Sequence, residues 1–353
     1  MTMTKAALLW GANEPWSVEA VEIGQPQPGE VTVKLVAAGL GHSDHHLVTG
    51  SSPPLGFPVL GGHEGAGIVT EIGSGVERLE VGDHVVLTPA PLCGSQGGGR
   101  IRARGRDVFL SSRLGTFCPY AVAPQQSVVK VDSAVPLRVA SLLGCTVLTG
   151  HGAATHSAGV RPGEDVVVVG LGGVGMSAVQ GAARAGARHV FVVDPAEWKR
   201  DAALAFGATH GYADLGSAMG GVADATNGLM AKKVIVAVGY VDGRDLDTWL
   251  ILTSKGGVCV LAALGDLAST DVTANLAINI LLQKRLQGSL LGGGNAHHDI
   301  PLLASMYLAG KLDLDEMVTR EYRLDQINDG FRDMLDGKLI RGIIRYAEED
   351  WGR

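Results

Sequence analysis

The sequence contains few cysteines and no long apolar segments, and both features bear on the cellular compartment in which we expect the protein. Its four cysteines are spread widely over 353 residues, which excludes the disulfide framework of a small secreted domain. No apolar run approaches the roughly 18 residues of a membrane-spanning helix. The N-terminus, MTMTKAALLW, is too short in apolar residues for a secretory signal. We therefore expect a cytoplasmic protein with reduced thiols and no membrane partner.

Positive charge is also scarce. The chain has 29 Lys and Arg against 36 Asp and Glu, a formal net charge of −7. A nucleic-acid-binding protein needs a basic surface, so we expect no nucleic-acid partner and a small-molecule substrate instead. At roughly 150 residues per domain, the length predicts two domains with substantial cores.

The two parts of the chain show different periodicities. The first 145 or so residues contain short alternating segments such as Val31–Val36 and Gly67–Ile72, typical of half-buried strands in a mainly β domain. After Gly150 the strands become continuous apolar runs, Asp165–Val169 and His189–Val193 among them, separated by helical patterns. Such βαβ units predict an α/β domain with a doubly wound parallel sheet, buried on both faces.

A glycine pattern follows the first of these buried strands. Gly170-x-Gly172-x-x-Gly175 lies between a strand and a helix, the setting in which such glycines bind a pyrophosphate at a helix N-terminus. Asp194 ends the second strand, where a carboxylate accepts the ribose hydroxyls and repels a 2′-phosphate. The pattern therefore predicts NAD(H) rather than NADP(H). Lys199, one helical turn later, is either a ribose contact or a solvated lysine.

Three further segments carry a resemblance to a known family. They are Gly39–Gly50, the GGHEGAG segment at Gly61–Gly67, and Leu142–Gly150 before the glycine pattern. With them the chain resembles the zinc-type medium-chain dehydrogenase/reductase superfamily over almost its whole length. The segments Gly207–His210, Gln283–Ser289 and Gly337–Arg341 are similar to those of nicotinoprotein, nitrosoaniline-dependent alcohol dehydrogenases.

The resemblance implies a fold and an assembly. A GroES-like, mainly β catalytic domain would comprise residues 1–148 and 291–353, and a Rossmann domain residues 149–290. It also implies a homodimer or homotetramer formed through the Rossmann sheet edge near 286–291, and NADH that stays tightly bound.

The resemblance also assigns roles to residues. Ser43 and His46 match the proton relay, His42 and Arg341 contact the pyrophosphate, and Thr149 lies near the nicotinamide. The full set of cofactor-binding residues that we expect is His42, Thr149, Gly170, Leu171, Gly172, Gly173, Val174, Gly175, Asp194, Lys199, Val238 and Arg341.

The sequence departs from the family at both zinc sites. His63 and Cys145 match two ligands of the catalytic zinc, but Gly41 stands where the first ligand cysteine belongs. A catalytic zinc normally has three protein ligands, so the metal is either lost or held by His63, Glu64 and Cys145. The structural zinc site needs four cysteines, of which this chain keeps only Cys93. We expect no structural zinc.

Three functions remain open. In the first, His63, oriented by Asp44, acts as a general acid in a zinc-independent NAD(H)-dependent oxidoreductase acting on a carbonyl, an alcohol or a conjugated C=C bond, with Glu64 in the same polar cluster. In the second, the protein is an ordinary zinc alcohol dehydrogenase that uses His63, Glu64 and Cys145. In the third, it is a non-catalytic NAD-binding sensor.

One motif lies outside these assignments. The segment Arg100–Arg106 carries four arginines at alternating positions where the structural zinc lobe would be. It is either a contact for an anionic partner or a solvated surface loop.

Overall fold

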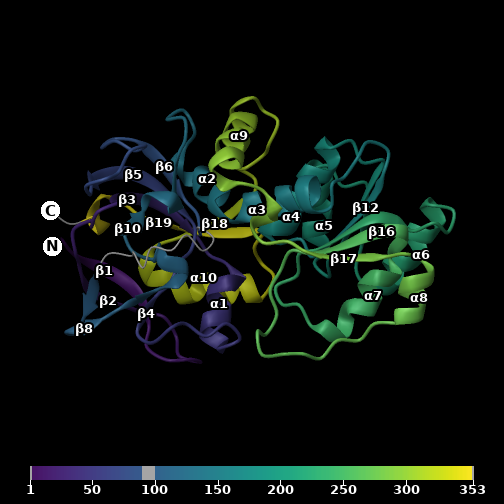
Figure 1. The fold of residues 1–353 in the computed structure, drawn as a ribbon, viewed down its shortest axis with the longest axis horizontal. Helices are drawn as coiled ribbons and strands as arrows, with labels where there is room; N and C mark the ends of the chain where they lie inside the picture. The colour runs from purple at the N-terminus through teal and green to yellow at the C-terminus, as the bar shows by residue number, and fades with distance from the viewer. Residues whose placement is uncertain (1, 90–99, 352–353) are drawn as a thin grey trace. The chain divides into compact units, whose positions relative to one another are not determined.

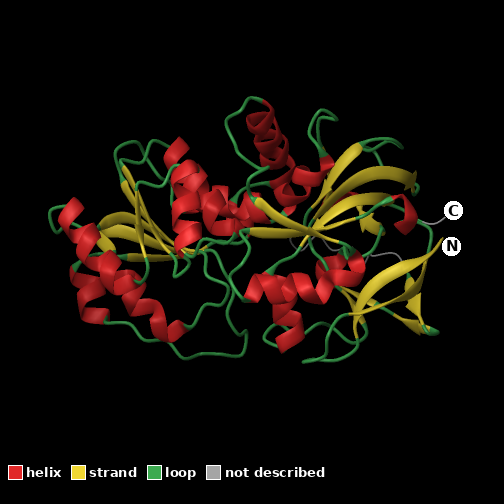
Figure 2. Ribbon diagram, turned by 180° about the vertical axis from the view of Figure 1, so that it is seen from behind, coloured by secondary structure: helices red, strands yellow, loops and turns green. Residues whose placement is uncertain are grey.

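The computed structural model describes residues 2–89 and 100–351. The chain forms two compact units, one comprising Met1–Cys145 and Ala296–Arg353 and the other Thr146–Asn295. Figures 1 and 2 show the ribbon from opposite sides. The first unit is called the catalytic unit below, and the second the nucleotide unit.

Two sheets form the described part of the catalytic unit. One has the strand order β8-β7-β2-β1-β4-β9, and its strands are β1 (Thr2–Leu9), β2 (Ser17–Ile23), β4 (Val59–Leu60), β7 (Ile101–Ala103), β8 (Arg106–Asp107) and β9 (Phe109–Leu110). The other has the order β11-β6-β5-β3-β19-β18 with β10 also paired to β3, and its strands are β3 (Glu30–Gly39), β5 (Gly65–Ile72), β6 (His84–Leu87), β10 (Tyr120–Pro124), β11 (Val128–Lys130), β18 (Val318–Tyr322) and β19 (Arg341–Arg345).

Short helices complete this unit, and its core lies between the sheets. The α-helices are α1 (His42–Thr49), α2 (Leu137–Ala140), α9 (Ala296–Leu308) and α10 (Ile327–Leu335). Alternating side chains of the strands, for example Val31, Val33 and Leu35 of β3, are fully buried and join residues of the C-terminal segment in one hydrophobic cluster. Burial of these apolar side chains provides the main stabilisation of the unit.

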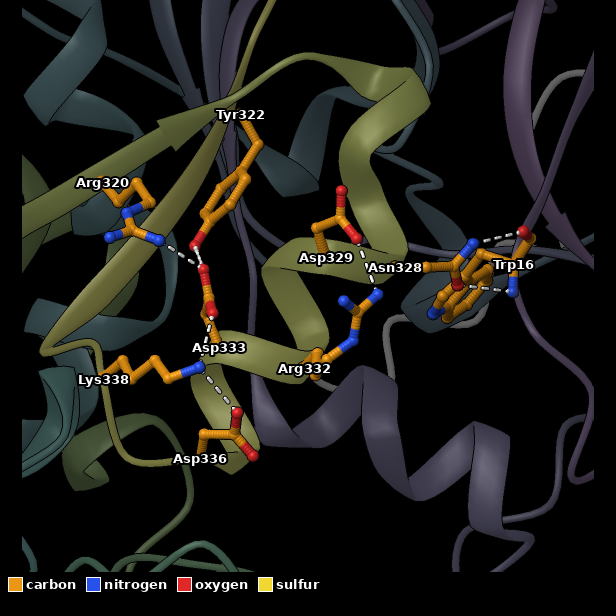
Figure 3. Close-up of polar contacts among 9 residues, drawn as sticks. All are labelled: Trp16, Arg320, Tyr322, Asn328, Asp329, Arg332, Asp333, Asp336 and Lys338. Carbon is orange, nitrogen blue, oxygen red and sulfur yellow. Dashed lines mark hydrogen bonds and ion pairs between the residues drawn. The ribbon is translucent and has the colours of Figure 1, made fainter.

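The last strands of this unit come from the C-terminal segment. β19 pairs antiparallel with β3, and β18 pairs parallel with β19. Figure 3 shows how α10 secures them: Asp333 accepts hydrogen bonds from Tyr322 (2.8 Å) and Arg320 (2.6 Å), and Lys338 lies 3.3 Å from the same carboxylate. These contacts fix the turn that leads into Arg341, the first residue of β19.

A six-stranded parallel sheet forms the centre of the nucleotide unit. Its order is β14-β13-β12-β15-β16-β17, with β12 (Asp165–Val169), β13 (His189–Val193), β14 (His210–Tyr212), β15 (Ala231–Val236), β16 (Thr253–Leu261) and β17 (Arg285–Gly288). The helices are α3 (Thr146–Gly152), α4 (Gly173–Arg184), α5 (Glu197–Ala205), α6 (Leu215–Ala225), α7 (Leu246–Ile251) and α8 (Leu276–Leu281).

Helices lie on both faces of this sheet (Figure 1). Val167 and Val169 of β12 pack with Val222 of α6 and Trp249 of α7 on one face, and α4 lies on the other. The doubly wound parallel sheet predicted from the continuous apolar runs is therefore confirmed. Among the described residues, no helix is both long and apolar enough to cross a bilayer.

Candidate active site

A buried histidine–aspartate pair forms the centre of the catalytic unit's polar cluster. Asp44 lies on α1 and is fully buried, and its Oδ2 is 2.9 Å from Nδ1 of His63. The other oxygen, Oδ1, accepts the backbone N–H of Gly62 at 2.9 Å. These bonds fix the His63 ring, whose second neighbour is the thiol group of Cys145.

The surroundings of His63 favour its protonated form. Burial by itself would lower the pKa of the imidazole. The charge of Asp44 and the hydrogen bonds to Asp44 and Cys145 outweigh burial and raise the pKa well above its usual value. A proton held at His63 can be donated to an oxygen atom that gains negative charge during a reaction.

Gly41, which stands where the first ligand cysteine belongs, faces this histidine. Gly41 caps the N-terminus of α1. A Cβ atom built on it would lie 2.9 Å from Cε1 of His63 and 3.2 Å from Nη2 of Arg341. A side chain at this position would therefore crowd the His63 ring, which would have to shift, and would also contact the Arg341 guanidinium group.

Glu64 is committed to other partners. Its Oε1 accepts Nε of Arg341 at 3.1 Å and also Nη2 of the same guanidinium, in a buried ion pair. Its Oε2 accepts the backbone N–H of Cys145 at 3.1 Å. The carboxylate thus links β19 to the segment before α3. This pairing was not predicted from the sequence, where Glu64 was considered as a metal donor and Arg341 as a pyrophosphate contact.

The described residues do not fit a complete catalytic zinc site. They contain no group of three or more His, Cys, Asp or Glu side chains close enough to hold a metal ion. His63 and Cys145 are neighbours, but the third donor that a catalytic zinc requires is not gathered with them. Cys93, the remaining cysteine of the structural zinc segment, lies outside the described residues.

The residues expected to relay protons lie on α1. Ser43 is exposed, and His46, three residues later on the same helix, is only 4% exposed. Residues three apart are neighbours on a helix surface, so the two side chains lie on the same side of α1. His42, at the first position of the helix, is half-buried.

The glycine loop of the nucleotide unit has a distinct spatial requirement at each glycine. Gly170 has φ +90°, a conformation that only glycine adopts easily. A Cβ on Gly175 would overlap the carbonyl oxygen of Gly170, whereas a Cβ on Gly172 would meet nothing within 4 Å. The open space at Gly172 lies at the N-terminus of α4, where backbone N–H groups attract a phosphate. The loop therefore fits a dinucleotide.

Four other residues expected to bind the cofactor also belong to the nucleotide unit. Gly173 is the first residue of α4 and Val174 the second. Val238 follows β15, and its backbone nitrogen would lie 3.0 Å from a Cβ on Gly170. Thr149 is buried on α3.

Asp194 directly follows β13 and is hydrogen-bonded to the glycine loop. Its carboxylate is 8% exposed and accepts the backbone N–H of Leu171 at 2.8 Å and of Ala196 at 2.9 Å. Lys199 is almost buried near it. Burial lowers the pKa of the Lys199 ammonium group, and the charge of Asp194 opposes this effect in part.

The segment Arg100–Arg106 forms the β7–β8 hairpin, and its charges are partly paired. Nε of Arg104 lies 2.7 Å from Glu19, and the guanidinium groups of Arg104 and Arg106 lie 4.7 and 5.6 Å from the ring centre of Trp10. These contacts attach the hairpin to the rest of its sheet, so the arginines support local packing.

Two family patterns match the chain. The pattern described as "Alcohol dehydrogenase GroES-like domain" matches residues 27–133, and the one described as "Zinc-binding dehydrogenase" matches residues 173–308. The first lies in the catalytic unit, which confirms the GroES-like fold class expected for it.

Several known proteins match almost the whole chain. Alcohol dehydrogenase B of Mycobacterium tuberculosis is 56% identical, over 98% of this chain and 99% of its own. The NDMA-dependent alcohol dehydrogenase of Amycolatopsis methanolica is 40% identical, over 98% and 100%. The crystal structure of benzyl alcohol dehydrogenase from Acinetobacter calcoaceticus superimposes with a TM-score of 0.89 at 28% identity, over 98% of this chain and 100% of that one.

Proposed function

Because the chain belongs to the alcohol dehydrogenase family of medium-chain dehydrogenases, we propose that it is an NAD(H)-dependent oxidoreductase working without a complete catalytic zinc site. The family is one of oxidoreductase enzymes, and this chain is similar to its members over nearly its full length. We propose as substrates carbonyl compounds, the corresponding alcohols, or compounds with a C=C bond conjugated to a carbonyl.

The geometry at Gly41 is the main support for zinc independence. The position of the first ligand cysteine carries no side chain, and both oxygens of Glu64 are bonded to Arg341 and to the Cys145 backbone. Recruiting Glu64 as a metal ligand would leave the buried Arg341 guanidinium without its partner. Breaking a buried ion pair costs about 3–5 kcal/mol, which opposes that alternative.

The chain's own residues can replace part of the metal's role. When bound, nicotinamide supplies or accepts the hydride. His63 would turn its Nε2 proton from the Cys145 sulfur to the substrate oxygen as negative charge develops there, and Asp44 holds the ring in place through Nδ1. We assign Ser43 and His46 to restoring that proton from solvent, since one is exposed and the other buried. In the reverse direction the same groups remove a proton from an alcohol.

The nucleotide unit supports NAD(H) as the cofactor. The open space at Gly172 would receive the pyrophosphate, and Asp194 would accept the ribose hydroxyls. His42, Thr149, Val238 and Arg341 remain proposed cofactor contacts. Similarity to the NDMA-dependent alcohol dehydrogenase further supports retention of NADH through purification, which an absorbance spectrum of freshly purified protein would reveal.

Metal analysis tests the zinc-free proposal. Protein purified without added zinc should contain well under one zinc per chain. Gly41→Cys should raise the content to about one, because a small shift of the His63 ring would admit the new side chain and its thiolate would complete a three-ligand set with His63 and Cys145. Gly41→Ala is the matched control, since it adds the same Cβ without a ligand. One zinc per wild-type chain would instead support an ordinary zinc enzyme using His63, Glu64 and Cys145.

Turnover separates an enzyme from a sensor. NADH-dependent reduction of a panel of enals, ketones and aldehydes should yield at least one substrate. Tight NADH binding without turnover of any panel member would favour the non-catalytic NAD-binding alternative.

We also propose that copies of the chain associate through β17. All four residues of this strand are exposed at the edge of the sheet, and Leu286 and Leu290 are 51% and 71% exposed. An exposed strand edge with apolar side chains favours pairing with a second copy. Sedimentation should give a dimer or tetramer. Among the described residues, Cys118, Cys145 and Cys259 form no disulfide bond, which supports our proposal of a cytoplasmic location.

A further inference from the structure

The ammonium group of Lys199 has an unusual environment in the nucleotide unit. The residue is 7% exposed, and within the described residues its Nζ has no hydrogen bond or ion pair, only the charge of Asp194 and the ring of Trp198 near it. Asp194 acts on it through its charge and forms no hydrogen bond with it. A buried ammonium group with unused donors lacks partners that a polar ligand can supply.

Arg200, the residue after Lys199 on α5, already donates hydrogen bonds to the backbone. Nη1 of Arg200 donates to the carbonyl oxygens of Asp194 at 2.7 Å and of Pro195 at 2.9 Å. Arg200 therefore stabilises the turn after β13. Lys199 is left as the cation available to a ligand next to Asp194.

The aromatic ring of Trp198 lies next to this ammonium group. Its ring centre lies 5.6 Å from Nζ of Lys199, within the range of a cation–π interaction. The ring is 40% exposed in the first turn of α5, just after the strand that ends beside Asp194. A large aromatic side chain at this end of the sheet lies where doubly wound folds bind the adenosine part of a dinucleotide.

We propose that Trp198 is a positioning residue of the dinucleotide site, whose ring holds the Lys199 ammonium group beside Asp194 so that it can donate to the adenosine ribose. The proposal rests on the proposed function, because that assigns Asp194 and Lys199 to the cofactor. Its consequence is slower release of the adenosine half of NADH. The flexible lysine side chain is ordered before binding, which lowers the entropic cost of using it.

The experiment measures binding to the full-length chain with NADH, adenosine monophosphate and nicotinamide mononucleotide as probes. Trp198→Leu keeps an apolar side chain but removes the aromatic face, and should weaken NADH and adenosine monophosphate about fivefold. Trp198→Phe keeps an aromatic face and should restore most of the affinity. Nicotinamide mononucleotide should bind equally to all three. Leu204→Ala, an exposed position of the same helix with no cation beside it, is the matched control.

The same substitution made in a Lys199→Gln variant shows whether Trp198 acts through Lys199. In Lys199→Gln protein, Trp198→Leu should cause no further loss, because the group it orders is gone. An undiminished fivefold loss in that background would overturn the positioning role, as would equal affinity of Trp198→Leu and wild type. Thermal melting of each variant shows that the fold is intact. Wild-type protein that binds no dinucleotide at all would instead refute the proposed function itself.

Discussion

The nucleotide unit and the catalytic unit differ in how completely they keep the features of their family. In the nucleotide unit each glycine of the loop meets the spatial demand of its position, and Asp194 is bonded to the loop it supports. In the catalytic unit the base of the site persists as Asp44 and His63, while a ligand position is glycine. Under the proposed function, cofactor binding and proton transfer remain in a chain that lacks the first zinc-ligand side chain.

The largest effect should come from the catalytic unit. Asp44→Asn keeps an acceptor for the Gly62 N–H but removes the charge that favours protonated His63. We expect kcat for NADH-dependent reduction to fall about 1,000-fold, the scale of general acid catalysis. NADH affinity should stay unchanged, since Asp44 is not among the residues to which we assign cofactor contacts and is fully buried against His63 and Gly62. An unchanged kcat would show that His63 does not supply the proton.

The next effect distinguishes two glycines of the loop. Gly175→Ala places a methyl group on the Gly170 carbonyl oxygen, and the resulting strain should weaken NADH about 100-fold and lower the melting temperature. Gly172→Ala is the control for stability, because its methyl group would enter open space. It should leave the melting temperature unchanged and still weaken NADH. Full NADH affinity in Gly172→Ala would place the pyrophosphate elsewhere.

A smaller effect concerns the choice between NAD(H) and NADP(H). Asp194→Ser should reduce the preference for NADH over NADPH about tenfold, since it removes the charge that repels a 2′-phosphate. Titration of both cofactors into wild type and variant measures this ratio. If the ratio does not move, another residue makes the ribose contact.

The smallest effect is a pH dependence. Because burial lowers the pKa of Lys199, this group loses its proton at a lower pH than the usual lysine value of about 10.4. NADH affinity should therefore fall about threefold as pH rises through that lowered pKa, the scale of one hydrogen bond lost to a ligand. Lys199→Gln should bind NADH weakly at all pH values, so the two proteins converge at high pH. Parallel titration curves would contradict this role.

How much the sequence reveals depends on the spacing of the residues concerned. The parallel sheet and the glycine loop were predictable because strand, glycines and Asp194 follow one another within some thirty residues. The pairing of Glu64 with Arg341 was not, since 277 positions separate them and only the folded sheet brings them together. A carboxylate beside a histidine suits both a metal ion and a guanidinium group, and the amino-acid types alone do not decide between them.

The C-terminal segment, residues 296–353, completes the catalytic unit that the N-terminal residues begin, and this order has a consequence for biosynthesis. β18 and β19 are the last strands to leave the ribosome, after the whole contiguous nucleotide unit has emerged. The nucleotide unit can fold while the chain is still being synthesised. The catalytic unit cannot form the ion pair between Glu64 and Arg341 until the C-terminal segment has left the ribosome. Truncation near the C-terminus would therefore leave a dinucleotide-binding fragment attached to an unfinished partner that chaperones must recognise.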